Sequence, residues 1–173
     1  MPQIARSRKS SSRKPYRVGR SKTGLGLFAI EPIRKGTFII EYWGRRIPTK
    51  ITDSLETKYL FEINTRWTVD GSTRRNIARY INHSCRPNAE SDIKKGAILI
   101  SAIKNIKPGD EITYNYGKGY FETFIKPKGC KCAACIEKRR LARAEARAKN
   151  GKANGTRRAR RPKAAKSGRN AAS

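Results

Sequence analysis

The chain has 173 residues, and its 41 Lys and Arg outnumber its 13 Asp and Glu to give a formal net charge of +28. This length suits one domain of modest size, and so one-sided a charge favours a polyanionic partner such as nucleic acid. No stretch reaches the apolar length of a membrane span, and the N-terminus lacks the apolar block of a signal peptide. We therefore expect no membrane association and a reducing, cytoplasmic setting.

The basic residues are concentrated at the two ends. Residues 1–20 hold seven Lys and Arg and no acid, and residues 138–173 hold fourteen against the single acid Glu145. The remaining 20 basic and 12 acidic residues lie between these ends, where the net charge is only +8. Residues 150–173 show no apolar periodicity, which predicts disorder. We expect a disordered basic arm over residues 1–14, and a basic helix with a disordered tail over residues 138–173.

Such basic ends predict binding to DNA or RNA through the phosphates, without sequence preference and with a steep dependence on salt. A tail that only keeps the protein soluble is the alternative.

Order is expected to begin near Tyr16, and the predicted elements beyond it are mostly strands. Short runs rich in β-branched and aromatic residues predict strands over residues 27–30, 38–42, 59–63, 67–69, 97–103 and 111–116. Glycine-containing turns precede several of them, at residues 22–26, 34–36, 94–96 and 107–110. Helical signals are limited to short pieces at residues 52–57 and 76–81 and a longer helix over residues 136–149. The fold class predicted is mainly β, with no internal repeat.

The four cysteines suit a single metal site. Cys85 stands in the stretch 79–88 beside His83, the only histidine, and Cys130, Cys132 and Cys135 form a CxCxxC cluster. A closed structural zinc site takes four ligands, so Cys85 is the sulfur expected to complete the cluster. Three alternatives stay open: His83 replaces Cys85 as ligand, a pair of cysteines forms a disulfide, or the four thiols are unrelated.

Several motifs then recur in one order. They are GLGLFA from Gly24, EYWG from Glu41, TVDG from Thr68, RYINHSC from Arg79 with Pro87-Asn88 after it, GDEITYNY from Gly109, and the cysteine cluster. Together, over roughly residues 17–135, they resemble the SET-domain protein lysine methyltransferases. The GxG is weak evidence alone, whereas the combination of NHSCxPN, GDExxxxY and CxC is highly specific. The chain departs from the family pattern in having two residues between its last cysteines, where many members have four, and no cysteine-rich segment before the domain. It resembles a minimal member, as in bacterial representatives.

The resemblance implies a SET-domain fold of small sheets over residues 15–125. The segment after Gly109 is expected to thread, like a pseudoknot, under a loop formed by the Asn82 stretch. A zinc-binding post-SET segment is expected over residues 126–137. The implied cofactors are S-adenosylmethionine, bound on one face, and Zn²⁺, with the target lysine entering a narrow channel from the opposite face.

The same resemblance assigns site residues. Tyr116 matches the catalytic tyrosine, Tyr59 a second tyrosine of the channel, and Tyr114 the position that governs how many methyl groups are added, which predicts mainly monomethylation. Plain strand packing of these tyrosines is the structural alternative. Residues implied to bind the cofactor are Gly24, Leu25, Gly26, Tyr42, Trp43, Arg79, Asn82, His83 and Tyr116, with Tyr120 or Phe121 over the adenine.

The expected function is methyl transfer to the side-chain amine of lysine in a basic protein, either histone-like, nucleoid-associated or the chain itself. A dry channel beside a cationic sulfonium would lower the pKa of the lysine, so that no dedicated base is needed. Two rival functions remain: a nucleic-acid-binding architectural protein, and a lysine-peptide-binding module without turnover. The expected location is cytoplasmic and associated with the nucleoid or chromosome, with delivery into a host cell left open.

Overall fold

The computed structural model describes residues 14–55 and 57–159. The chain divides into two units, residues 1–135 and 136–173. In the described part of the first unit the strands form three small sheets, one of four strands and two of three. The mainly β fold of small sheets predicted from the sequence is confirmed.

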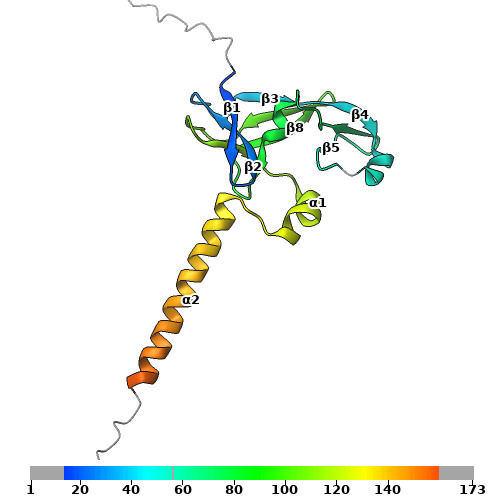
Figure 1. The fold of residues 1–173 in the computed structure, drawn as a ribbon. Helices are drawn as coiled ribbons and strands as arrows, with labels where there is room; N and C mark the ends of the chain where they lie inside the picture. Colours follow the sequence, from blue (N-terminus) through cyan, green and yellow to red (C-terminus); the bar gives the residue numbers. More distant parts are fainter. Residues whose placement is uncertain (1–13, 56, 160–173) are drawn as a thin grey trace, which may run out of the picture. The chain divides into compact units, whose positions relative to one another are not determined.

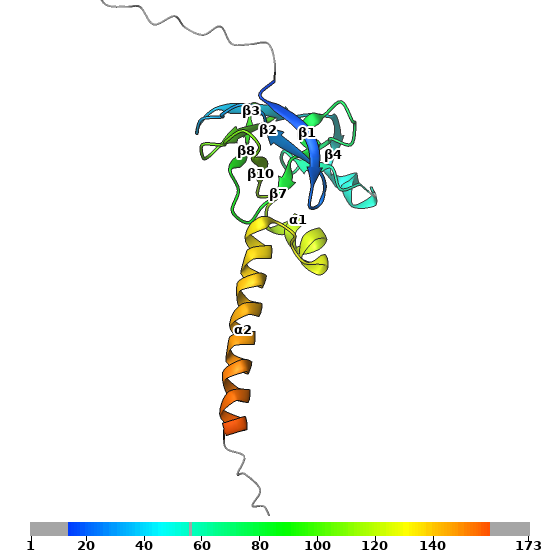
Figure 2. The same ribbon diagram turned by 60° about the vertical axis from the view of Figure 1, so that its left-hand side comes forward.

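The four-stranded sheet has the order β1-β2-β10-β7 (Figure 2). β1 (Tyr16–Ser21) and β2 (Gly24–Ala29) form an antiparallel hairpin, and β2 also pairs with β10 (Glu111–Tyr114). β10 then runs parallel to β7 (Asn82–His83). The sequence did not predict β1, because its residues Arg17, Gly19 and Arg20 interrupt the apolar pattern. It also did not predict β7, which has only two residues.

The second sheet has the order β3-β9-β8, with β3 (Phe38–Tyr42), β9 (Ala97–Ala102) and β8 (Ala89–Lys94). β8 and β9 are joined by Lys95 and Gly96, both with positive φ, as a tight hairpin turn requires. The strands β3 and β9 were predicted. β8 was not, because its mostly polar sequence AESDIK lies largely at the surface.

The third sheet has the order β4-β6-β5, with β4 (Arg45–Pro48), β6 (Trp67–Asp70) and β5 (Leu60–Glu62), of which β4 and β5 are labelled in Figure 1. β4 is an edge strand with two arginines and a proline, and the sequence did not predict it. The two short helices predicted nearby are 3₁₀ turns at Thr49–Ser54 and Ile77–Tyr80.

The core lies where these elements meet. Its most buried large side chains, each less than 2% exposed, include Leu27, Ile81, Ile98, Ile100 and Ile112. They come from β2, β9, β10 and the residue that follows the 3₁₀ turn Ile77–Tyr80. The stretch leading into Asn82 is therefore held by the central core.

The chain after β10 forms helical turns. α1 (Lys118–Tyr120) continues into a π-helical turn (Phe121–Ile125) and a 3₁₀ turn (Lys126–Lys128). α2 (Ala133–Ala159) follows as one continuous helix (Figure 1). It begins before and ends after the predicted range 136–149, and the disorder predicted for residues 150–159 is replaced by helix. Residues 138–149 are rich in Ala, Arg and Lys, which are strong helix formers, and the helix continues from them through residues 150–159 although these include two Gly and two Asn.

The disorder predicted for residues 1–13 and 160–173 lies outside the described residues. Within the described ranges, none of the helices combines the length and the apolar character needed to cross a lipid bilayer.

Candidate functional site

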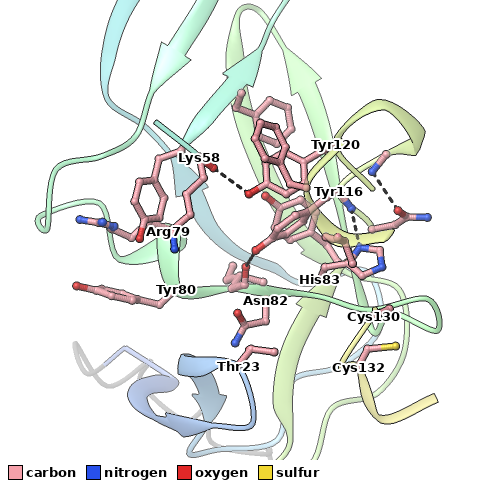
Figure 3. A pocket seen from close by; sticks show the side chains of 18 of the residues that line it. Thr23, Lys58, Arg79, Tyr80, Asn82, His83, Tyr116, Tyr120, Cys130 and Cys132 are labelled. Atoms are coloured by element: carbon pink, nitrogen blue, oxygen red, sulfur yellow. Dashed lines mark hydrogen bonds between the residues drawn. The ribbon is translucent and has the colours of Figure 1, made fainter. Parts of the chain in front are cut away.

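A pocket of about 950 Å³ lies between residues 58–62, the stretch 79–83 and the chain from residue 114 onward (Figure 3). It brings together ten residues predicted for catalysis or cofactor binding: Gly24, Leu25, Tyr42, Tyr59, Arg79, Asn82, His83, Tyr114, Tyr116 and Tyr120. Three others do not line it. Trp43 is 43% exposed, Phe121 packs against the His83 ring at 5.4 Å between centroids, and Gly26 lies beside the pocket on β2.

Tyr116 is fixed at two points (Figure 3). Its hydroxyl donates a hydrogen bond to the backbone carbonyl of Ile81 at 2.6 Å, and its backbone N–H donates to Nδ1 of His83 at 3.3 Å. Burial lowers the pKa of His83, which favours the neutral ring, and because Nδ1 accepts from Tyr116 the single proton is assigned to Nε2. Nε2 lies 3.4 Å from Sγ of Cys85. His83 thus links Tyr116 to the cysteine cluster.

Aromatic rings form one wall of the pocket. The centroid of Tyr116 lies 4.9 Å from those of both Tyr114 and Tyr120, and Tyr114 continues to Phe61 at 6.4 Å and Phe61 to Tyr42 at 5.6 Å. Burial raises the pKa of Tyr42, Tyr114 and Tyr116 above the ordinary value of tyrosine. These hydroxyls therefore keep their protons at neutral pH.

Tyr59 is held in place through both its backbone carbonyl and its ring. Its backbone carbonyl accepts hydrogen bonds from the hydroxyl of Tyr42 at 2.7 Å and from the N–H of Gly71 at 2.9 Å. The guanidinium of Arg79 lies 3.9 Å from the centroid of its ring, a close cation–π contact. Arg79 also donates to the carbonyl of Ser72, while its buried Nε has no hydrogen-bond partner in the described part of the chain.

Asn82 is oriented by Glu111. The Asn82 amide donates to the Leu25 carbonyl at 2.9 Å and to Oε1 of Glu111 at 2.7 Å, and Oε2 of Glu111 accepts from the Ser21 hydroxyl at 2.9 Å. A Cβ at Gly26 would stand 2.5 Å from Oε1 of Glu111. The missing side chain at Gly26 therefore makes room for this carboxylate, which holds Asn82 in place.

The sequence reasoning missed several residues that line the pocket or contact a residue that lines it. Glu111 stands inside the GDE motif but was given no role, although its carboxylate is the acceptor that Asn82 needs. Lys58 and Phe61 flank Tyr59, and their proximity to it was a usable signal. Phe124 stands four residues after Tyr120, and the centroids of the two tilted rings lie 4.7 Å apart, as helical spacing allows.

The four cysteines converge as predicted. Their Sγ atoms all lie within 4.8 Å of one another, with Cys85 at 3.9 Å from Cys130 and 3.5 Å from Cys135. A disulfide needs about 2.05 Å between sulfurs. A tetrahedral zinc site with Zn–S bonds of about 2.3 Å places its sulfurs about 3.8 Å apart. The spacing fits zinc and excludes the disulfide alternative.

The surroundings of the sulfurs also suit a metal. Burial tends to raise the pKa of Cys132, but hydrogen bonds from the backbone at Cys85 and Cys135 outweigh it and lower the pKa to about 7. Burial raises the pKa of Cys85 and of Cys130, so of these three thiols Cys132 is the one that most readily forms the thiolate that binds zinc. The four cysteines supply the four candidate ligand atoms, and His83 contacts the sulfur of one of them, Cys85. His83 therefore lies where it can orient a metal ligand without binding the metal itself.

Comparison with known proteins agrees with this site. The family model described as "SET domain" matches residues 24–117. The putative histone-lysine N-methyltransferase ASHH4 of Arabidopsis thaliana is 36% identical over 146 residues, which cover 77% of this chain and 41% of that protein. The H3 lysine-4 specific histone-lysine N-methyltransferase of Schizosaccharomyces pombe is 41% identical over 105 residues, 53% of this chain and 11% of that protein.

Among solved structures, ctPRC2 in an autoinhibited conformation bound to S-adenosylmethionine matches with a TM-score of 0.54 and 33% identity, over 61% of this chain and 15% of that chain. The chain thus spans less than half the length of each of these proteins. The family match over residues 24–117, the three small sheets and the four-cysteine cluster lead to one assignment. The chain belongs to the SET-domain family, with a C-terminal cysteine cluster consistent with a post-SET site.

Proposed function

We propose that this chain transfers a methyl group from S-adenosylmethionine to the side-chain amine of lysine in a basic, histone-like or nucleoid protein. The observation that carries the proposal is the convergence of Tyr59, Tyr114 and Tyr116 on one pocket beside Asn82 and His83. The two relatives described above are named as histone-lysine N-methyltransferases, which supports the substrate class. S-adenosylmethionine supplies a methyl group on a cationic sulfonium, ready for in-line displacement by an amine.

The methyl donor, S-adenosylmethionine, is proposed to be held by the residues at the Asn82 end of the pocket. Arg79 provides hydrogen-bond donors there, and Gly24 and Leu25 provide a short backbone wall. Both N–H groups of the Asn82 amide donate to Leu25 and Glu111, so Asn82 offers its carbonyl oxygen as an acceptor. Tyr120 covers the same space from the segment after β10, where its hydroxyl donates to the Lys58 carbonyl at 3.2 Å. The cysteine cluster is proposed to hold a structural Zn²⁺.

Tyr116 is proposed as the catalytic residue that positions the reacting groups. Its proton is donated to the Ile81 carbonyl, so towards the pocket its oxygen can act only as an acceptor. An acceptor at this point can orient an amine N–H. Because burial raises the pKa of Tyr116, the phenol does not serve as a base. Alignment of the amine is the main contribution expected of it.

The amine must lose its proton before it attacks. The aromatic wall disfavours an ammonium ion by desolvation, and the cationic side chains of Lys58 and Arg79 line the same pocket. Both effects lower the pKa of a bound lysine, so the proton can leave to solvent without a dedicated base.

The number of methyl groups added is proposed to depend on Tyr114, which is only 6% exposed and packs 4.9 Å from Tyr116. Its hydroxyl takes up space that a methylated amine needs in order to realign, which favours monomethylation. Mass spectrometry of histones and bacterial nucleoid proteins treated with the chain and S-adenosylmethionine tests the whole proposal. We expect monomethyl-lysine from the wild type and more dimethyl-lysine from Tyr114→Phe. Absence of methyl-lysine in every substrate, including the chain itself, would exclude the activity.

A nucleic-acid partner is also proposed, through α2. With about 100° between successive helical residues, Arg139, Arg140, Arg143 and Arg147 fall within one sector of about 100°, opposite Leu141. Arg140 is engaged with Glu137 at 2.7 Å. The guanidinium groups of Arg143 and Arg147 suit bidentate contacts with phosphates. Binding to DNA that already carries basic chromosomal proteins would bring the chain close to those proteins, whose charge would otherwise repel it.

Filter binding of the full chain to duplex DNA, measured over a range of salt concentrations, tests this partner. Replacing Arg143 and Arg147 by Gln is expected to reduce the slope of log K against log salt by about 1.8, since each phosphate contact contributes about 0.9. The matched Lys replacements keep the charge and should keep the slope. An unchanged slope in the Gln variant would rule out phosphate contacts by this face.

A further inference from the structure

Glu62 is the one acidic residue among those that line the pocket in the described structure. The basic residues that line it are Lys58, Arg79, Lys128 and Lys131. Glu62 is exposed, and it forms no ion pair with any described part of the chain. A solvent-accessible carboxylate without a partner, in a pocket otherwise lined by cations, is available to a cation from another molecule.

The position of Glu62 relates it to the proposed lysine channel. It ends β5, one of the two edge strands of the third sheet, three residues after Tyr59. At about 3.3 Å per residue, the two positions are about 10 Å apart along an extended chain. A peptide that places a lysine beside Tyr59 covers the same distance in two or three of its own residues. Glu62 is therefore within reach of a side chain close to the target lysine.

The charge of the protein indicates which type of substrate side chain would pair with Glu62. The protein carries a net charge of +28, so a basic peptide meets general repulsion, and the lining cations add to it locally. An exposed carboxylate in the lining of the pocket offsets this repulsion at one point. Arg forms the stronger pair there, because its planar guanidinium can donate two parallel hydrogen bonds to a carboxylate.

We propose that Glu62 determines substrate specificity by selecting lysines that have an arginine, or a second lysine, two or three positions away. This inference rests on the proposed methyltransferase function and names the sequence context that the same site accepts. Glu62 is a binding residue for the flank of the substrate and does not touch the reacting amine.

The test uses synthetic peptides with a single lysine in a Gly/Ser/Ala background, and a single arginine placed in turn at each position on either side. Steady-state kcat and KM are measured for the wild type, for Glu62→Gln, and for Glu90→Gln as a matched control on the exposed part of β8, outside the pocket. The wild type and the control should show a KM about fivefold lower for the peptide with arginine at the favoured position, the scale of one accessible ion pair. Glu62→Gln should lose this difference with kcat unchanged, and high salt should reduce it in the wild type.

Glu62→Asp, which keeps the charge on a shorter side chain, should retain part of the preference and covers the case in which the Gln variant folds poorly. If Glu62→Gln prefers the arginine peptide as the wild type does, the inference is overturned while the methyltransferase proposal stands. If the wild type methylates no peptide, both fail. Equal KM values for all peptides in the wild type would also overturn the inference, without affecting the proposed activity.

Discussion

Replacing Tyr116 by phenylalanine isolates the contribution of one hydroxyl. The ring keeps its neighbours Tyr114 and Tyr120, both at 4.9 Å, so little packing is lost. What disappears is the 2.6 Å hydrogen bond to the Ile81 carbonyl. The free energy of unfolding should fall by about 1 kcal/mol, or by up to about 3 kcal/mol if the buried carbonyl finds no other donor. The rate of methyl transfer should fall much further, by about a hundredfold, because the incoming amine loses its positioning acceptor.

Two measurements on the same samples separate these effects. Urea unfolding gives the stability, and single-turnover transfer from labelled S-adenosylmethionine at saturating substrate gives the rate of the chemical step. Tyr16→Phe is the matched control, since Tyr16 is a partly buried tyrosine of β1 outside this pocket. A rate for Tyr116→Phe within about twofold of the control would contradict the placement of this hydroxyl at the reacting groups.

Three further changes have expected outcomes. A strong chelator should release about one zinc per chain and lower Tm. Methyl transfer should also slow, because His83 connects Cys85 to Tyr116, and both properties should recover when Zn²⁺ is added. An unchanged Tm in metal-free protein would contradict the proposed metal site. Glu111→Gln should raise the KM for S-adenosylmethionine and lower the free energy of unfolding by about 1–2 kcal/mol, because Glu111 accepts hydrogen bonds from both Asn82 and Ser21. If calorimetry shows that this variant binds S-adenosylmethionine with wild-type affinity, the role given to Asn82 is contradicted. Gly71→Ala should destabilise the fold by about 1–3 kcal/mol, since a Cβ there would overlap the Tyr42 ring. Gly119→Ala, with open space around the glycine, is its control in the same melting experiment.

The parts of the fold that the sequence predicted are those with a strong local pattern. β3 consists largely of β-branched and aromatic residues and β9 is mostly apolar, and the structure contains both strands. β1 has two arginines and a glycine among its six residues, so only its pairing with β2 makes it a strand. α2 shows the reverse case, because its composition predicted disorder beyond residue 149 while the helix continues to Ala159.

In the site, too, residues within a local motif were predicted, whereas contacts between distant residues were not. Sequence motifs named the cysteines, and the convergence of their sulfurs is confirmed. The roles given to Tyr59, Tyr114 and Tyr116 stay predictions, although the three residues do share a pocket. Contacts between distant positions were not predictable from local pattern. The hydroxyl of Tyr120 reaches the carbonyl of Lys58, and the carboxylate of Glu111 joins Ser21 to Asn82. Both depend on how the sheets pack, which no local motif encodes.

The imidazole of His83 has a consequence for how variants of this protein are interpreted. It contacts the backbone of Tyr116 on one side and the sulfur of Cys85 on the other. A genetic screen that scores only lost activity would therefore group changes at the cysteines with changes at the tyrosines, although no cysteine is proposed to meet the substrate. Measuring bound metal for each inactive variant would sort the two classes, and it would show which positions could be altered without disturbing the scaffold that both share.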